Sequence, residues 1–250
     1  MKNGLLVAAF AALIAIVARK KKSGGTGGGT GGNGGNNTAV DILKSITVTF
    51  DREGVWQPES ATGQKKDKGN YYPYEGANRV YYGTNYGVTA AFLVEHKNIL
   101  KIPITDKNVI KNLTKEQARD IFTKTIGARM RYNELKNQFV ANFLFDWMVH
   151  RPTTCVKFIC GEIFGFNNAE IQSEVDKAKF SDGLMTKING VNPSDFYNSM
   201  KFWRFYHLTY TDAYVSFRKG VYNRIAKFKD FDETNKVKEM RQIAYKKAFG

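Results

Sequence analysis

The stretch LKNQFVANFLFDWMVHRP, residues 135–152, decides the fold class of this chain. Large apolar side chains recur in it about every four residues, at Leu135, Phe139, Phe143 and Trp147. This is the period of one face of an α-helix, whereas a half-buried strand alternates every two residues. The stretch therefore predicts a core helix, which Pro152 stops or kinks because proline has no backbone N–H to donate.

Helix signals of the same kind surround this stretch. Thr114 and Gln117 match a capping box, in which two side chains satisfy the first backbone N–H groups of a helix. Apolar periodicity and chain breakers predict further helices over residues 156–164, 192–205, 215–228 and 231–249. The last of these is expected to bury one face, formed by Val237, Met240, Ile243 and Ala244.

A first helix is expected over residues 38–53. Thr38 is its predicted N-cap, and its apolar face is formed by Val40, Leu43, Ile46 and Phe50. The β-branched residues of ITVTF, residues 46–50, leave a strand as the alternative. Residues 55–88 contain six tyrosines among Gly, Asn and Lys, which favours loops or a small β-hairpin region. We therefore expect a mainly α fold with a small loop-rich or β lobe near its start.

Residues 1–22 are interpreted as a membrane segment with a basic flank. LLVAAFAALIAIV, residues 5–17, is uncharged and precedes Arg19 and three lysines. Its length is marginal for a spanning helix of about 20 residues and fits a signal-peptide core equally well. A cleavage site prefers small neutral residues where the basic cluster stands, which favours a retained anchor that meets the membrane through residues 5–18. The orientation is left open, because the positive-inside tendency would keep the remainder of the chain in the cytoplasm.

A tether comes after the anchor. SGGTGGGTGGNGGNN, residues 23–37, has no apolar residue to bury and is expected to behave as a flexible coil. The folded domain is placed at residues 38–228, with residues 229–250 as a C-terminal amphipathic helix packed on it.

The composition is basic, with 38 Lys and Arg against 23 Asp and Glu, a formal net charge of +15. Such a surplus attracts polyanions, whether nucleic acid, acidic lipid or an anionic wall polymer. The basic residues are dispersed among the predicted helices instead of forming one stripe. We therefore expect no specific nucleic-acid partner, and a nucleic-acid binder is kept only as a third hypothesis.

Cysteine and histidine offer no metal site. Cys155 and Cys160 stand five residues apart on a predicted helix, where they would not meet, so both are predicted as core residues without a disulfide. The three histidines stand far apart in the sequence, at His96, His150 and His207. No zinc-like spacing results. We expect no metal and no cofactor.

Carboxylates are the remaining catalytic candidates. Glu53 is the best placed, at the end of the first predicted helix and close to Trp56, where the chain enters a polar, aromatic-rich segment. A glutamate held against an apolar wall keeps its proton, as a general acid for glycosidic cleavage must. The alternative is a solvated charge at a helix end. Asp146, inside the core helix, is interpreted as structural.

Two motifs carry a family resemblance. EGVW, residues 53–56, and GTNYGVT, residues 83–89, resemble the EGGY and GG-x-T-x-x-GIT motifs of the glycoside hydrolase family 108 lysozymes of phages and bacteria. Further segments are similar to that family in the same order: LTKEQARDIF at 113–122, LFDWMVH at 144–150, SDGLMT at 181–186 and FRKGVYNRI at 217–225. The likeness extends over roughly residues 41–228.

The resemblance implies a lysozyme-like helical fold and hydrolysis of the glycan bond after N-acetylmuramic acid in peptidoglycan. It makes Glu53 the general acid, and Thr84 the residue that holds the attacking water or orients a catalytic group. Trp56, Asn85 and Tyr86 are expected to bind substrate, the rings by stacking on sugars. A turn threonine and ordinary aromatic packing are the alternatives. A phage-encoded enzyme of lysis or wall penetration, anchored at the membrane and acting at the cell wall, is the expected context.

The sequence departs from the family where a second carboxylate is expected. Residues 79–82 stand where the family has a D-P-G-G run, so its aspartate is missing. Glu75 is the predicted replacement, with Asp67 and Glu59 as alternatives. The loss leaves two further hypotheses open: a lytic transglycosylase, which needs only one glutamate, or a non-catalytic wall-binding or structural virion protein.

Overall fold

The computed structural model describes residues 40–53, 56–60, 68–73, 78–104, 106, 108–212, 215 and 217–250, with the backbone alone at 52 and 53. Residues Ala39–Gly250 form one compact unit. The predicted anchor, tether and Thr38 cap lie outside the described residues. None of the helices in the described part of the chain combines the length and apolar character that a membrane span requires.

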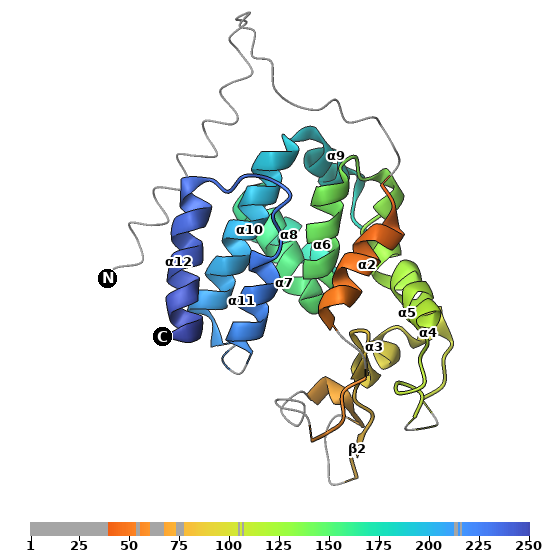
Figure 1. Ribbon diagram of the computed structural model, residues 1–250. Helices are drawn as coiled ribbons and strands as arrows, with labels where there is room; N and C mark the ends of the chain where they lie inside the picture. The colour runs from red at the N-terminus through yellow and green to blue at the C-terminus, as the bar shows by residue number, and fades with distance from the viewer. Residues whose placement is uncertain are drawn as a thin grey trace, which may run out of the picture. The chain divides into compact units, whose positions relative to one another are not determined.

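The described unit is mainly helical, as the sequence predicts (Figure 1). Its α-helices are α2 (Ile42–Glu53), α3 (Ala90–Glu95), α4 (Lys97–Leu100), α5 (Lys115–Phe122), α6 (Gln138–His150), α7 (Pro152–Lys157), α8 (Asn168–Asp176), α9 (Asp182–Gly190), α10 (Pro193–Tyr210), α11 (Arg218–Ala226) and α12 (Asn235–Phe249). Short 3₁₀ turns stand at Lys68–Asn70 and Tyr132–Glu134, and wider π-helical turns at Thr123–Gly127 and Phe158–Ile163.

Helix α6 is the core helix that the sequence predicts. Asn137 caps it by accepting hydrogen bonds from the backbone N–H groups of Phe139 and Val140, and all residues from 140 to 148 are buried. It lies between α2 and α10 and packs against both (Figure 1). Pro152 stands in the first turn of α7, where its missing N–H costs no hydrogen bond. The stretch at 135–152 thus forms the centre of the helical body.

Helix α2 lies along α6 and begins later than expected. The Asp41 carboxylate accepts a hydrogen bond from the backbone N–H of Leu43 at 2.9 Å, and the helix starts at Ile42. The strand alternative for residues 46–50 is wrong, because Ser45, Ile46, Thr49 and Phe50 are the buried residues here and follow helical spacing. Leu43, predicted on the buried face, is 50% exposed.

Polar side chains join α2 to α6 inside the core. The Ser45 hydroxyl lies 2.6 Å from the Tyr132 hydroxyl and donates to Asn142 Oδ1 at 2.5 Å. The Gln138 amide reaches the same group, donating to Tyr132 at 3.0 Å and to Asn142 at 2.8 Å. Burial raises the pKa of Tyr132 to about 12, so the phenol stays protonated as a donor. The network fixes how α2, which ends at Glu53, sits on the body.

Helices α10, α11 and α12 form a layer beside α6 (Figure 1). Asn192 caps α10, as the Asn-Pro-Ser sequence indicates, and Thr234 caps α12. Val237, Met240 and Ala244 of α12 are buried as predicted. Ile243 is 45% exposed, so its predicted burial is wrong. Each residue turns a helix by about 100°, which carries position 243 off the stripe that includes 244.

A buried charge cluster crosses this layer. Asp146 is fully buried and accepts hydrogen bonds from Arg204 at 2.8 Å and from Arg224 at 2.9 Å. Burial alone would raise the pKa of this carboxyl, but the two guanidinium groups outweigh it and hold the pKa far below its usual range. Asp146 therefore joins α6 to α10 and α11 as an ion, which is a structural role as the sequence predicts.

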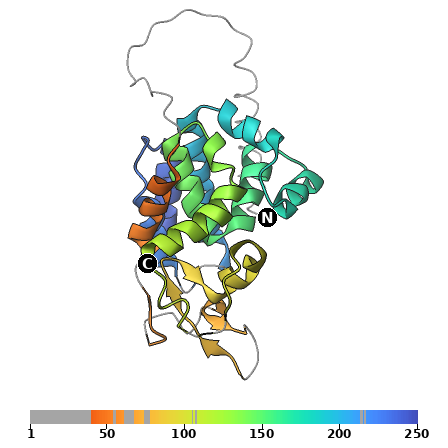
Figure 2. The same cartoon turned by 90° about the vertical axis from the view of Figure 1, so that its right-hand side faces the viewer.

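The small lobe contains two short hairpins below the helical body (Figures 1 and 2). Strands β1 (Tyr71–Tyr72) and β2 (Val80–Tyr81) pair antiparallel, with Tyr71 opposite Tyr81. Strands β3 (Thr84–Asn85) and β4 (Val88–Thr89) also pair antiparallel, with Thr84 opposite Thr89. Thr89 then caps α3. A helical body with a small strand region near its start is the fold that the sequence predicts.

Candidate functional site

The segment after α2 runs into the small lobe and pairs with β3. The backbone N–H of Gln57 donates to the carbonyl of Thr84 at 3.1 Å. The segment that follows Glu53 therefore meets the segment that contains Thr84, although the two are distant in sequence. The backbone of Glu53 ends α2 just before this contact. The fold brings together the two motifs on which the family resemblance depends.

Trp56 is half-buried against the turn before β3. Its indole N–H donates to the carbonyl of Tyr82 at 3.4 Å, and the amino group of Lys111 lies 5.1 Å from its ring centre. The Tyr81 hydroxyl donates to the carbonyl of Gln57 at 2.7 Å, which fixes the same segment from the other side. Trp56 is therefore fixed at the edge of the lobe. The sequence did not indicate that Lys111 would lie over its ring.

Gly83 is required at this junction for two reasons. Its φ of +76° lies in the left-handed region, which residues with a Cβ adopt at a cost. A Cβ at this position would also stand 2.8 Å from Trp56 Nε1 and 3.0 Å from the Gln57 carbonyl oxygen. This close approach and the positive φ explain why a glycine stands at the turn before β3.

Tyr86 and Gly87 form the two-residue turn between β3 and β4. Both have positive φ, +52° and +80°, as a type I′ hairpin turn requires. Asn and Gly are the usual residues there, so the tyrosine holds a conformation that costs roughly 1 kcal/mol or more. Its ring packs 5.2 Å from that of Phe50, one helical turn before Glu53. The contact ties the hairpin to the end of α2.

Asn85 anchors the loop between α4 and α5. Its side chain is 4% exposed, and the amide nitrogen donates to the carbonyls of Ile110, Lys111 and Leu113 at 3.1–3.2 Å. The amide nitrogen of this predicted substrate-binding residue therefore holds the loop in place. Its amide oxygen is buried and has no hydrogen-bond partner in the described part of the chain.

Three carboxylates are candidates for the second catalytic group. Glu75 and Asp67 lie outside the described residues, so the structure does not address either. Glu59 is described, and its carboxylate accepts a hydrogen bond from the Tyr71 hydroxyl at 2.8 Å. Burial, and then this hydrogen bond, raise the pKa of Tyr71. Arg79, from the segment that replaces the family's D-P-G-G run, lies over the Tyr71 ring at 4.5 Å.

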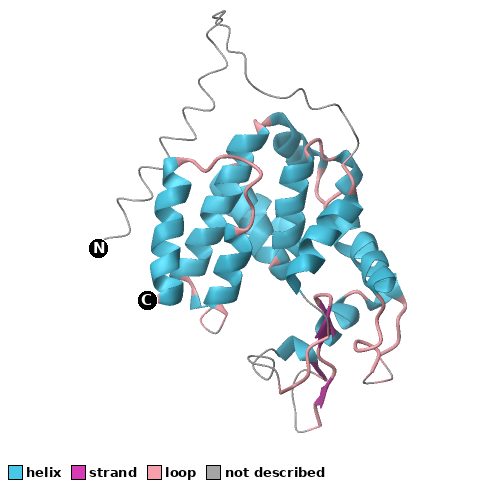
Figure 3. Cartoon of the chain, viewed as in Figure 1, coloured by secondary structure: helices cyan, strands magenta, loops and turns pink. Residues whose placement is uncertain are grey.

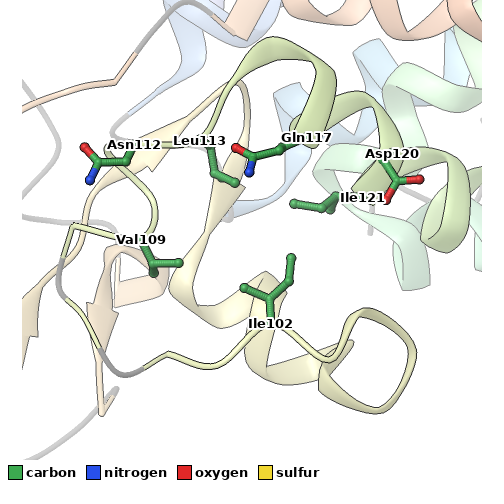
Figure 4. A pocket seen from close by; sticks show the side chains of 7 residues that line it. All are labelled: Ile102, Val109, Asn112, Leu113, Gln117, Asp120 and Ile121. Carbon is green, nitrogen blue, oxygen red and sulfur yellow. The ribbon is translucent and has the colours of Figure 1, made fainter.

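A cavity of about 280 Å³ opens beside the anchored loop (Figure 4). Ile102, Val109, Leu113 and Ile121 give it an apolar lining, and Asn112, Gln117 and Asp120 add polar groups at its edge. Gln117 also closes the capping box with Thr114, as predicted. No pattern in the sequence indicates this cavity, because it forms between α5 and a loop without regular structure.

Cys155 and Cys160 are unpaired and buried, as predicted. Burial raises the pKa of both thiols, to about 12 for Cys160, so neither is a reactive thiolate at neutral pH. Within the described residues, no three or more His, Cys, Asp and Glu side chains gather as metal ligands would.

Comparison with known proteins gives a family match and a similar solved structure. Residues 46–151 match the glycosyl hydrolase 108 family, a range that contains Glu53, Thr84 and the core helix α6. The match supports a glycoside hydrolase. The fold is similar to the structure of Brucella abortus SagA, with a TM-score of 0.55 and 18% sequence identity over 84% of this chain and 96% of that one. No curated protein matches the sequence.

Proposed function

We propose that this protein is a lysozyme-type peptidoglycan hydrolase, an N-acetylmuramidase, with Glu53 as its general acid. The observation that carries the proposal is the family match over residues 46–151, together with the hydrogen bond that joins the segment after Glu53 to Thr84. A general acid must protonate the leaving oxygen while a second group activates or orients the water. In this proposal Glu53 takes the first role and Thr84 takes the second.

The aromatic side chains support binding of a glycan. Trp56 is held at the edge of the lobe by its indole N–H, and an amphipathic ring of this kind can pack against the apolar face of a sugar. Tyr86 is fixed against α2 by Phe50. Glu75 is the proposed second carboxylate. Anchoring by residues 5–18, action at the cell wall and a phage role in lysis or wall penetration stay predictions.

The test is a turbidity assay on purified peptidoglycan. Glu53→Gln keeps the shape of the side chain and removes the acid, so activity should fall at least about 100-fold, the usual contribution of a general acid. Glu95→Gln is the matched control, because this exposed glutamate ends the neighbouring helix α3. Full activity in Glu53→Gln would refute the assignment of the acid.

Two further outcomes separate the alternatives. Products with reducing ends, identified by mass spectrometry, indicate hydrolysis, whereas anhydro sugars indicate a lytic transglycosylase. A wild-type protein that binds peptidoglycan without cleaving it would point to a wall-binding or structural role. Glu75→Gln tests the second carboxylate: a loss comparable with that of Glu53→Gln supports it, and wild-type activity excludes it.

A further inference from the structure

One end of the α10–α12 layer exposes large apolar side chains. Tyr210 at the end of α10 is 56% exposed, Phe217 before α11 is 41% exposed, and Tyr245 and Phe249 of α12 are 53% and 37% exposed. Helix α10 and helix α12 end on the same side of the layer, next to the loop that leads into α11 (Figure 3). We call these four residues, with Lys219, Lys246 and Lys247, the C-terminal tip.

Direct contacts join three residues of the tip: Tyr245, Phe249 and Lys219. Tyr245 and Phe249 stack with ring centres 4.8 Å apart, and Tyr222 of α11 packs edge-on against both, at 5.6 and 5.5 Å. The amino group of Lys219 lies 5.5 Å from the centre of the Phe249 ring. The exposed rings therefore form a fixed ridge between α11 and α12. The Lys219 amino group adds positive charge at the edge of this ridge.

Basic residues outnumber acidic ones around the ridge, although the exposed Asp212 stands two residues after Tyr210. The sequence has no Asp or Glu from 213 to 229 or from 240 to 250, although both segments are rich in Lys and Arg. Lys219, Lys246 and Lys247 are all exposed. Exposed apolar patches rimmed by polar residues mark interaction sites, and basic ones attract anionic surfaces.

We propose that the C-terminal tip docks on the surface of an anionic membrane. Aromatic side chains favour the headgroup region of a bilayer, and neighbouring lysines gain from the negative potential of acidic lipids. A glycan fits the tip less well. It would need flat free ring faces, but Tyr245 and Phe249 cover one another, and it would need convergent carboxylates or amides, which the two acid-free segments do not supply.

Vesicle sedimentation of the full chain tests the proposal. The probes are phosphatidylcholine vesicles with and without phosphatidylglycerol. Lys246→Glu/Lys247→Glu should weaken partitioning onto the anionic vesicles at least about 30-fold, because each lost basic residue costs roughly a factor of five and each added glutamate is repelled by the surface. Tyr245→Ser/Phe249→Ser should weaken it about tenfold, and this loss should persist at high salt.

The matched control is Lys136→Glu/Lys179→Glu, which changes the net charge equally at two exposed loop positions away from the tip. It should bind as wild type does. Equal loss in this control would overturn the proposal, since net charge alone would then account for binding. Thermal melts of each variant establish that it is folded, and Lys246→Gln/Lys247→Gln provides a milder change should the reversal unfold the chain.

A local probe reports on the tip whatever residues 5–18 contribute to binding. An environment-sensitive fluorophore on Lys247→Cys should shift to the blue with anionic vesicles, whereas the same label on Lys179→Cys should not. No shift at 247, or an equal shift at both positions, would overturn the proposal. The tip variants should still cleave purified peptidoglycan, and Glu53→Gln should still bind vesicles, so this proposal and that of the catalytic acid fail separately. Loss of peptidoglycan binding with unchanged vesicle binding would assign the tip to the wall and refute membrane docking.

Discussion

The helical body and the small lobe are held together in different ways. In the body, α6 is buried along most of its length, and Asp146 ties it to two neighbouring helices. In the lobe, strands of two residues depend on single side chains, chiefly Trp56 and Asn85, that bond to backbone carbonyls. Substitutions in the body should therefore unfold the whole unit, whereas those in the lobe should disturb the candidate site first.

The largest effect is expected at Asp146. Asp146→Asn removes the charge that Asp146 offers to two buried guanidinium groups and should lower the free energy of unfolding by about 3–5 kcal/mol. Denaturant titration followed by circular dichroism measures the loss. Asp182→Asn is the matched control, because that carboxylate is 92% exposed and pairs with Arg131 at the surface. A change no greater than that of the control would contradict the distinction between body and lobe.

A smaller effect is expected at Gly83. Gly83→Ala places a Cβ against Trp56 in a left-handed backbone conformation, which should cost about 3 kcal/mol in the lobe. Peptidoglycan hydrolysis should fall by a large factor while the melting of the body changes little. Gly190→Ala offers a control, since a Cβ there meets nothing within 4 Å. Retention of full activity would show that the Trp56 junction is not needed at the site.

Asn85→Ala tests the loop anchor. The substitution removes the hydrogen bonds to three loop carbonyls. It should lower the local stability of residues 110–113 by about 2 kcal/mol. Amide hydrogen exchange should rise in that loop and in β3, with little change in α6. Exchange that rises equally in α6 would mean that the lobe and the body unfold as one unit.

The last prediction concerns pH and the body alone. Burial, and then the charge of Arg151, lower the pKa of His207 to about 4, below the usual 6.5. The unfolded chain therefore binds a proton first, and stability should fall by up to roughly 1 kcal/mol per pH unit between pH 6.5 and 4. His207→Gln should lack this part of the pH dependence in denaturant titrations. An identical profile in the variant would exclude His207 as the cause.

Short sequence patterns predicted the helices and caps, because these features depend on residues that are close together in the chain. The core helix, the Thr114 capping box and the Asn192 cap follow from patterns a few residues long, and the family motifs located the segments that meet at Gln57 and Thr84. Tertiary contacts decided the rest. Sequence alone did not indicate that Arg204 and Arg224 would be buried, because their burial depends on a carboxylate from another helix.

The candidate site shows the same division. Its acid and threonine were named from motifs, whereas the lysine over Trp56 and the cavity beside α5 arise from a loop that no periodicity describes. The Asn85 anchor also joins residues about 25 apart in sequence. Its partners are backbone carbonyls, which leave no trace in the identity of the residues at 110–113.

The π-helical turn at Thr123–Gly127 has an evolutionary consequence. Such a turn holds one residue more than an α-helical turn, and Gly127 uses it to approach the first turn of α2, where a Cβ would stand 2.2 Å from Ile42 Cδ1. Substitutions cannot remove the extra residue; only a deletion can, and that would rotate everything beyond it by about 100°. A chain that keeps this fold should therefore keep the length of this segment, together with a side chain at position 42 that leaves room for Gly127.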